Sequence, residues 1–127
     1  MAQTAYVFGG IVQYDEPRWE PLELAVGEEL MEWFMWMFEV QTTEYRRFQA
    51  YKHRATRRYL HVDHQGCAYA FRGERKGRDR YEQIPLPDAI ELALCAWKYL
   101  GATADELALV DAAIERARNG LPGDAEQ

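Results

Sequence analysis

Two histidines, an aspartate and a cysteine lie within seven residues near the middle of this 127-residue chain. All four side chains, those of His61, Asp63, His64 and Cys67, carry atoms that bind metals. Zinc, however, requires three or four ligands that converge tetrahedrally. If the segment forms a hairpin, His64 points away from the other three, and a thiolate mixed with a carboxylate is a poor ligand set. We therefore predict neither a metal nor any other cofactor.

The same segment contains the components of a nucleophilic site. Cys67 can attack a carbonyl if His61 removes the thiol proton while Asp63 orients the imidazole ring. A hairpin tip provides neither an oxyanion hole nor a pocket wall, so we assign no catalytic residue. A serine hydrolase and a P-loop enzyme are excluded, because the chain lacks serine and the Gly-x-x-x-x-Gly-Lys-Thr motif. A cysteine-, histidine- or metal-dependent small enzyme is our third functional hypothesis.

These polar residues lie at the turn of a predicted β-hairpin, residues 57–72. The Asp-His-Gln-Gly sequence predicts a type I turn whose glycine adopts the left-handed conformation. That turn sets the register of the two strands, with His61 opposite Tyr69 and Tyr59 opposite Phe71. These four side chains share one face, which we predict to be the exposed binding surface. The other face is smooth and apolar, so we expect helices to cover it; it carries Leu60, Val62, Ala68 and Ala70.

The N-terminal part of the chain is predicted to contain one strand and two helices. Residues 4–14 are rich in β-branched and aromatic residues, which favours a strand. Residues 28–39 contain Met, Leu and Glu, which favour a helix. Residues 43–54 place apolar side chains three to four positions apart. That spacing favours an amphipathic helix with a basic outer side, although a strand is an alternative.

The C-terminal part is predicted to contain a charged loop over residues 73–80, a third strand over 81–84 and two helices. Proline and glycine bound a helix over 87–100, and a capping box opens another over 104–118. A polar tail, residues 121–127, follows. The elements together predict an α+β fold: a small antiparallel sheet around the central hairpin, packed on one face by helices, with a C-terminal helical hairpin.

Charge is unevenly distributed along the chain, although the net charge is −6. Residues 1–45 carry a net −8 and residues 81–127 a net −6, whereas the basic zone, residues 46–80, carries a net +8. Either the acidic flanks neutralise the basic zone within the fold, or the zone stays exposed and binds an anion. Aromatic residues are interleaved with its bases, which suits both stacking on nucleotide bases and contacts in a protein interface.

The preferred hypothesis is a non-enzymatic binding protein whose basic, tyrosine-rich zone holds an anionic partner, either nucleic acid or an acidic protein surface. The residues expected to contact the partner are Arg46, Arg47, Lys52, Arg54, Arg57, Arg58, Tyr59, His61, Tyr69, Phe71 and Arg72. The alternative is an adaptor, a regulator or a homodimer that uses an aromatic surface of the predicted helix 28–39. Its contact residues are Trp33, Trp36 and Phe38, because one helix rarely needs to bury so many large apolar side chains.

The length and composition fit a single domain, residues 1–127, with a real hydrophobic core. The longest apolar runs, such as residues 33–38, are far shorter than the ~20 residues that a membrane-spanning helix requires, so we expect no membrane partner. The N-terminus lacks the basic and apolar regions of a signal peptide. Two cysteines in separate elements predict free thiols, and the cytoplasm is the expected location.

Overall fold

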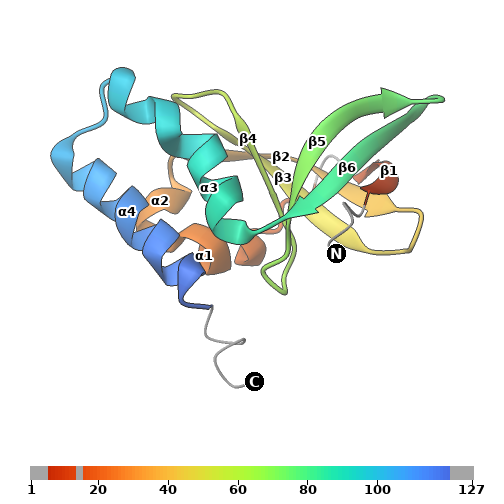
Figure 1. Ribbon diagram of the computed structural model, residues 1–127, viewed down its shortest axis with the longest axis horizontal. Helices are drawn as coiled ribbons and strands as arrows, with labels where there is room; N and C mark the ends of the chain where they lie inside the picture. The colour runs from red at the N-terminus through yellow and green to blue at the C-terminus, as the bar shows by residue number, and fades with distance from the viewer. Residues whose placement is uncertain (1–5, 14–15, 121–127) are drawn as a thin grey trace, which may run out of the picture.

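Six antiparallel strands close into a barrel in the computed structural model, which describes residues 6–13 and 16–120 (Figure 1). The strands are paired in chain order, and β1 pairs with β6 to close the barrel. Their bounds are β1 (Tyr6–Gln13), β2 (Phe34–Thr42), β3 (Arg47–His53), β4 (Tyr59–Val62), β5 (Ala68–Arg75) and β6 (Arg78–Ile84). The predicted polar tail, residues 121–127, lies outside the described residues.

Helices occupy the connection between β1 and β2 and the segment after β6. The first connection contains α1 (Glu20–Val26) and α2 (Glu28–Met31). After β6 come α3 (Leu86–Leu94), the 3₁₀ helix η1 (Cys95–Tyr99) and α4 (Ala104–Arg118). Figure 1 shows these helices gathered on one side of the barrel, while the β5–β6 hairpin extends away from them. None of the described helices is both long and apolar enough to cross a membrane.

The predicted small open sheet, packed on one face by helices, is wrong, because the sheet closes on itself. The predicted helix over 28–39 is largely wrong as well: only α2 is helical, and β2 occupies the rest. Residues 43–54 take the strand alternative, as β3. Both strands are buried on both faces, so apolar and polar residues do not alternate as they do in a half-exposed strand. Phe48 of β3 lies inside the barrel, whereas Tyr51 packs with the helices.

Two hydrophobic cores result from this arrangement. The helix core lies between the helices and the outer surface of the barrel, and it joins Ile90 and Trp97 to Leu60 and Val62 of β4. The barrel core lies inside the strands, and it consists of Val7, Val40, Phe48, Tyr69 and Tyr81. The rings of Phe48 and Tyr69 are stacked, with their centroids 4.3 Å apart.

The predicted central hairpin is confirmed near its turn, with His61 paired to Tyr69 and Val62 to Ala68, whereas the predicted pair Tyr59–Phe71 does not form. Gly66 has a φ of 84°, the left-handed conformation that the turn requires. Leu60, Val62 and Ala68 of its apolar face pack in the helix core as predicted, whereas Ala70 does not belong to that core. Local turn chemistry and side-chain alternation were therefore sufficient to define this element.

The predicted C-terminal helical hairpin is also confirmed, as α3 and α4. The Thr103 hydroxyl accepts a hydrogen bond from the Glu106 amide at 3.1 Å, and the Glu106 carboxylate accepts one from the Thr103 amide at 2.8 Å. The predicted loop over 73–80 is wrong, because β5 and β6 continue through it. They meet at a two-residue turn, Lys76 and Gly77, where both φ angles are positive, as a tight hairpin requires.

Candidate functional site

The strands β4 and β5 form only two residue pairs, so the ladder between them is the shortest in the barrel. The β4–β5 ladder ends at the pair His61–Tyr69, whereas β5 continues to Arg75 in its pairing with β6. Figure 1 shows the two strands diverging from their common turn. We call the diverging part, which begins at Tyr59 on β4 and Phe71 on β5, the seam.

The backbones of both strands present peptide groups to the seam. The Asp63 amide donates to the Cys67 carbonyl across the hairpin at 3.0 Å. The peptide groups of successive residues point to opposite sides of a strand, so every second residue from this pair points the same way. The peptide groups of Tyr59 and Phe71 therefore point into the seam, and neither residue belongs to the β4–β5 ladder.

Aromatic rings lie beside these peptide groups. Tyr59 is 37% exposed and Phe71 is 50% exposed. The Tyr59 ring lies 6.1 Å from the Phe38 ring and 5.8 Å from the Lys52 ammonium nitrogen, and the Phe71 ring lies 5.5 Å from that of Tyr81. Cationic and aromatic groups therefore adjoin at the seam, which suits a partner that carries negative charge together with apolar groups.

Two predicted contact residues lie inside the barrel instead of on its surface. His61 is 6% exposed and Tyr69 is 2% exposed. Their prediction as surface residues is wrong, because closure of the barrel turns this face of the hairpin inward. Burial lowers the pKa of His61 to about 4 and raises the pKa of Tyr69 to about 12. Both side chains are therefore neutral near pH 7, and both pack against Phe48.

Cys67 lacks the environment of a nucleophile. Burial raises the pKa of its thiol and the Asp63 carboxylate raises it further, while the Arg46 guanidinium, 3.9 Å from Sγ, lowers it. The Asp63 carboxylate accepts hydrogen bonds from the amides of Gln65 and Cys67, each at 2.9 Å, so it stabilises the turn. Within residues 6–13 and 16–120, no group of three or more His, Cys, Asp or Glu side chains is placed to hold a metal ion.

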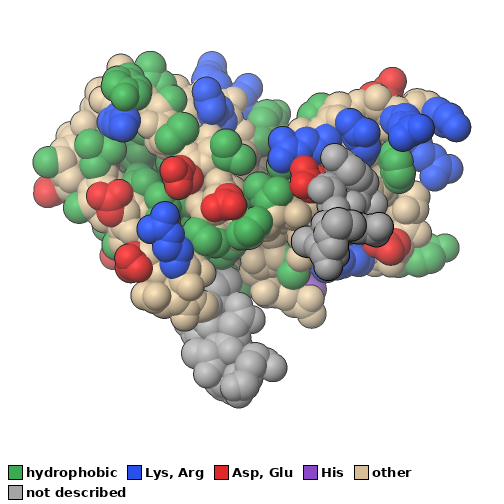
Figure 2. Space-filling view, viewed as in Figure 1, with side chains coloured by type: hydrophobic (Ala, Val, Ile, Leu, Met, Phe, Trp, Pro, Cys, Tyr) green, Lys and Arg blue, Asp and Glu red, His purple; other side chains and the backbone are tan. Residues whose placement is uncertain are grey.

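The predicted bases lie at several places on the molecule: Arg46 reaches Cys67 at the β4–β5 turn, Arg47 pairs with Glu39, and Lys52 lies beside Tyr59 at the seam. Arg54, Arg57 and Arg58 are exposed on the connection between β3 and β4. The Arg54 guanidinium donates to the carbonyl of Glu32 at 3.0 Å, and that of Arg58 reaches the carbonyl of Leu92 at 3.5 Å. These contacts orient the side chains without neutralising their charge. Figure 2 shows Lys and Arg side chains concentrated over the β5–β6 hairpin and Asp and Glu side chains spread over the helices.

Two predicted bases are paired with acids. Arg47 contacts Glu39 at 3.0 Å, and Arg72 contacts Glu82 at 2.8 Å. The other five predicted bases form no ion pair with any residue that the structure describes; they are Arg46, Lys52, Arg54, Arg57 and Arg58. Neutralisation of the basic zone by the acidic flanks is therefore partial.

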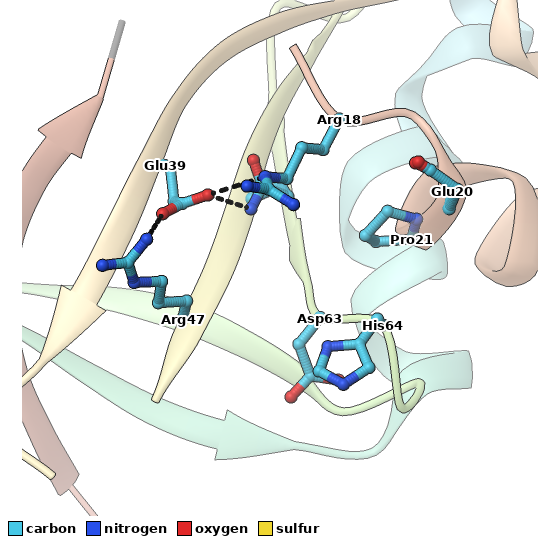
Figure 3. A pocket seen from close by; sticks show the side chains of 8 residues that line it. Arg18, Glu20, Pro21, Glu39, Arg47, Asp63 and His64 are labelled. Atoms are coloured by element: carbon cyan, nitrogen blue, oxygen red, sulfur yellow. Dashed lines mark hydrogen bonds and ion pairs between the residues drawn. The ribbon is translucent and has the colours of Figure 1, made fainter. Parts of the chain in front are cut away.

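A polar cleft of about 410 Å³ lies between the start of α1, β2, β3 and the β4–β5 turn (Figure 3). At one wall, the buried Glu39 carboxylate contacts Arg18 at 3.3 Å, Arg47 at 3.0 Å and the Gln49 amide at 2.9 Å. Figure 3 shows Asp63 on the other side of the cleft, where peptide amides hold its carboxylate. The ion pair between Arg18 and Glu39 ties the segment before α1 to the barrel at this cleft. Sequence reasoning missed Arg18 and Glu39, because only the folded chain brings them together.

The predicted aromatic surface does not lie on a helix. Trp36 and Phe38 belong to β2, and Trp33 lies in the turn before it. The Trp36 indole N–H donates to the Gln49 side chain at 2.8 Å, and the Trp33 ring lies 4.8 Å from that of Trp97. All three side chains are partly buried, so the helical face expected for an adaptor is not formed.

Comparisons of the chain with protein-family models, curated proteins and solved structures find no match. The seam and the charges around it are therefore the features that bear on function. Fold and site define a closed antiparallel barrel with an aromatic, basic seam between two diverging strands.

Proposed function

We propose that the protein is a non-enzymatic binding protein that holds an anionic partner, either nucleic acid or an acidic protein surface, at the basic zone beside the seam. The observation that carries the proposal is the exposure of Arg54, Arg57 and Arg58 on the connection that leads directly into β4 at Tyr59, whose ring is partly exposed. Exposed charges without acidic partners remain available to a ligand, and adjacent rings supply the contact area that charges alone do not provide.

The charge pattern supports this role in spite of the acidic composition. From Arg46 to Val62 the chain carries six bases and no acid, so the local potential is positive although the net charge is −6. A partner held by such charges releases counterions, and its affinity falls as salt rises. The cytoplasm suits this role, because Cys67 and Cys95 are both free thiols.

The proposal is tested by fluorescence anisotropy with two labelled anions, polyglutamate and single-stranded oligothymidylate. We expect at least one of them to bind, with an affinity that falls steeply between about 50 and about 200 mM salt. Replacing Arg57 and Arg58 by alanine should weaken that binding roughly tenfold, because two charges at the seam are lost.

A matched variant removes two exposed bases from the helical side, Lys98 and Arg118. It changes the net charge equally and should bind as the wild type does. An equal loss in both double variants would mean that the anions sense only net charge. Failure of both anions to bind at low salt would remove the proposal.

The other two hypotheses receive less support from the fold. An adaptor or homodimer built on an aromatic helix requires a helix at Trp36 and Phe38, where the chain forms β2. A cysteine-dependent enzyme requires a thiolate, whereas burial raises the pKa of the Cys67 thiol.

A further inference from the structure

We propose that the anionic partner is an acidic polypeptide segment that binds in extended conformation, as an added β-strand along the edge of β5 at the seam. This inference rests on the proposed function and names the class of partner for the same site. Strand addition requires a strand edge whose peptide groups are not already paired.

The edge of β5 meets this requirement at Phe71. Its pairing with β6 continues through Phe71 opposite Tyr81, while its pairing with β4 ends two residues earlier, at Tyr69. The alternation of peptide groups predicts that the Arg72 carbonyl points toward β6. It does so, since it accepts a hydrogen bond from the Arg80 guanidinium at 2.9 Å. The neighbouring Phe71 peptide group therefore points away from β6, into the seam.

The side chains at the seam indicate which sequence would bind. Alternate side chains of an added strand project to opposite faces of the sheet. On the inner face they meet the rings of Tyr59 and Phe71 and the Lys52 ammonium group. Arg72 lies on the outer face, where it already pairs with Glu82. A short strand that alternates acidic with apolar residues can therefore place its apolar side chains against the two rings and its acidic side chains on the outer face, beside Arg72. A bulge between Phe71 and Glu74 ends the regular edge and limits its length.

A polypeptide fits these features better than a nucleic acid. The peptide groups of the seam require alternating N–H and C=O partners, which a phosphate backbone does not offer. The β5–β6 hairpin also carries Glu74, Asp79 and Glu82 among its bases, and these acids would repel a continuous row of phosphates. An acidic peptide instead carries its charges on separate side chains, which can point toward the bases and away from these acids.

The test uses the full chain and three labelled probes of equal charge. The first is a synthetic peptide that alternates glutamate and valine, and the second is the same peptide with every backbone amide N-methylated, so that neither edge of the strand can donate a hydrogen bond. The third is oligothymidylate. We expect the first peptide to bind and the N-methylated peptide to bind at least about tenfold more weakly, because strand pairing is lost while charge is kept. Hydrogen exchange of the Phe71 amide should slow in the complex.

Two variants separate the backbone of Phe71 from its ring. Phe71→Pro removes both the ring and the N–H that points into the seam, whereas Phe71→Ala removes only the ring. We expect the proline variant to bind the acidic peptide about tenfold more weakly than the alanine variant. Circular dichroism establishes that both are folded. If the proline variant does not fold, the N-methylated peptide still provides the test.

The outcomes distinguish this inference from the proposed function. If both peptides bind equally well and hydrogen exchange at Phe71 is unchanged, the protein holds anions but not as an added strand, and the inference fails. Preferential binding of oligothymidylate overturns it in favour of nucleic acid. If none of the three probes binds at low salt, the proposed function itself fails.

Discussion

The Glu39 carboxylate and the Arg47 guanidinium lie 3.0 Å apart on neighbouring strands, and the Glu39 side chain is 2% exposed while that of Arg47 is 55% exposed. The carboxylate also contacts Arg18 and Gln49. A nearly buried anion with three donors is stable because its charge is matched, and replacing the carboxylate by an amide removes that charge and one of the two acceptor oxygens.

We therefore expect Glu39→Gln to lower the free energy of unfolding by about 1–3 kcal/mol, as measured by urea denaturation. The matched control is Glu82→Gln, which breaks the more exposed pair with Arg72. It should cost less than about 1 kcal/mol, because solvent screens exposed ion pairs. Equal costs for the two variants would mean that the contacts around Glu39 do not hold the barrel to α1.

The barrel core depends on Phe48. Its ring is fully buried and lies within 6 Å of the rings of Tyr69, Tyr81 and His61. Phe48→Ala should lower the free energy of unfolding by about 3–5 kcal/mol, because it leaves a cavity that the closed barrel cannot collapse. Phe71→Ala, at a half-exposed ring, should cost about 1 kcal/mol or less. A small effect at Phe48 would contradict the closed barrel.

The stability should depend on pH through the buried histidines. The pKa of His61 is about 4 in the folded protein and about 6.5 when the chain is unfolded, so the unfolded state binds the proton more readily. The stabilisation is complete above about pH 6.5 and is lost as the pH falls toward 4, by on the order of 3 kcal/mol. Burial lowers the pKa of His53 to about 4 as well, which adds to the loss in the same range.

The contribution of His61 is measured by urea denaturation at several pH values between 7 and about 4. His61→Phe should show a shallower decline than the wild type. His64→Ala, at an exposed residue of the turn, should follow the wild-type curve. If His61→Phe declines as steeply as the wild type, His61 is not held neutral by the barrel.

The capping box of α4 predicts a local and separable effect. Thr103→Ala removes the hydroxyl that accepts the Glu106 amide hydrogen bond and should cost about 1 kcal/mol in thermal or urea denaturation. Affinity for the acidic peptide should stay unchanged, because α4 lies on the helical side of the barrel, away from the β5–β6 hairpin (Figure 1). A change in affinity would link α4 to the seam.

Local signals predicted the central hairpin and the C-terminal helices, since a turn sequence, a glycine at Gly66 and a capping box at Thr103 each act within a few residues. They did not predict β2, and they left β3 open between a helix and a strand. Phe34 of β2 faces the helix core and Val40 the barrel core, with a bulge between them at Trp36. A strand with apolar residues on both faces and an irregular register shows neither the helical spacing of three to four residues nor the alternation of a half-exposed strand.

The candidate site was predicted only in part, because the exposure of its residues depends on strand pairing that is distant in the sequence. The rings of Tyr59 and Phe71 are exposed, as expected, but His61 and Tyr69 on the same face are buried. Whether that face points outward or inward depends on the pairing of β1 with β6, which joins residues at least seventy positions apart in the sequence. No pattern within a short window carries that information.

The strand β3 supplies Phe48 to the barrel core and Tyr51 to the helix core. Because one strand belongs to both, neither layer can melt while the other stays ordered. Heating should therefore produce a single calorimetric transition, with equal van't Hoff and calorimetric enthalpies. Cooperativity in this protein thus originates in a strand only seven residues long.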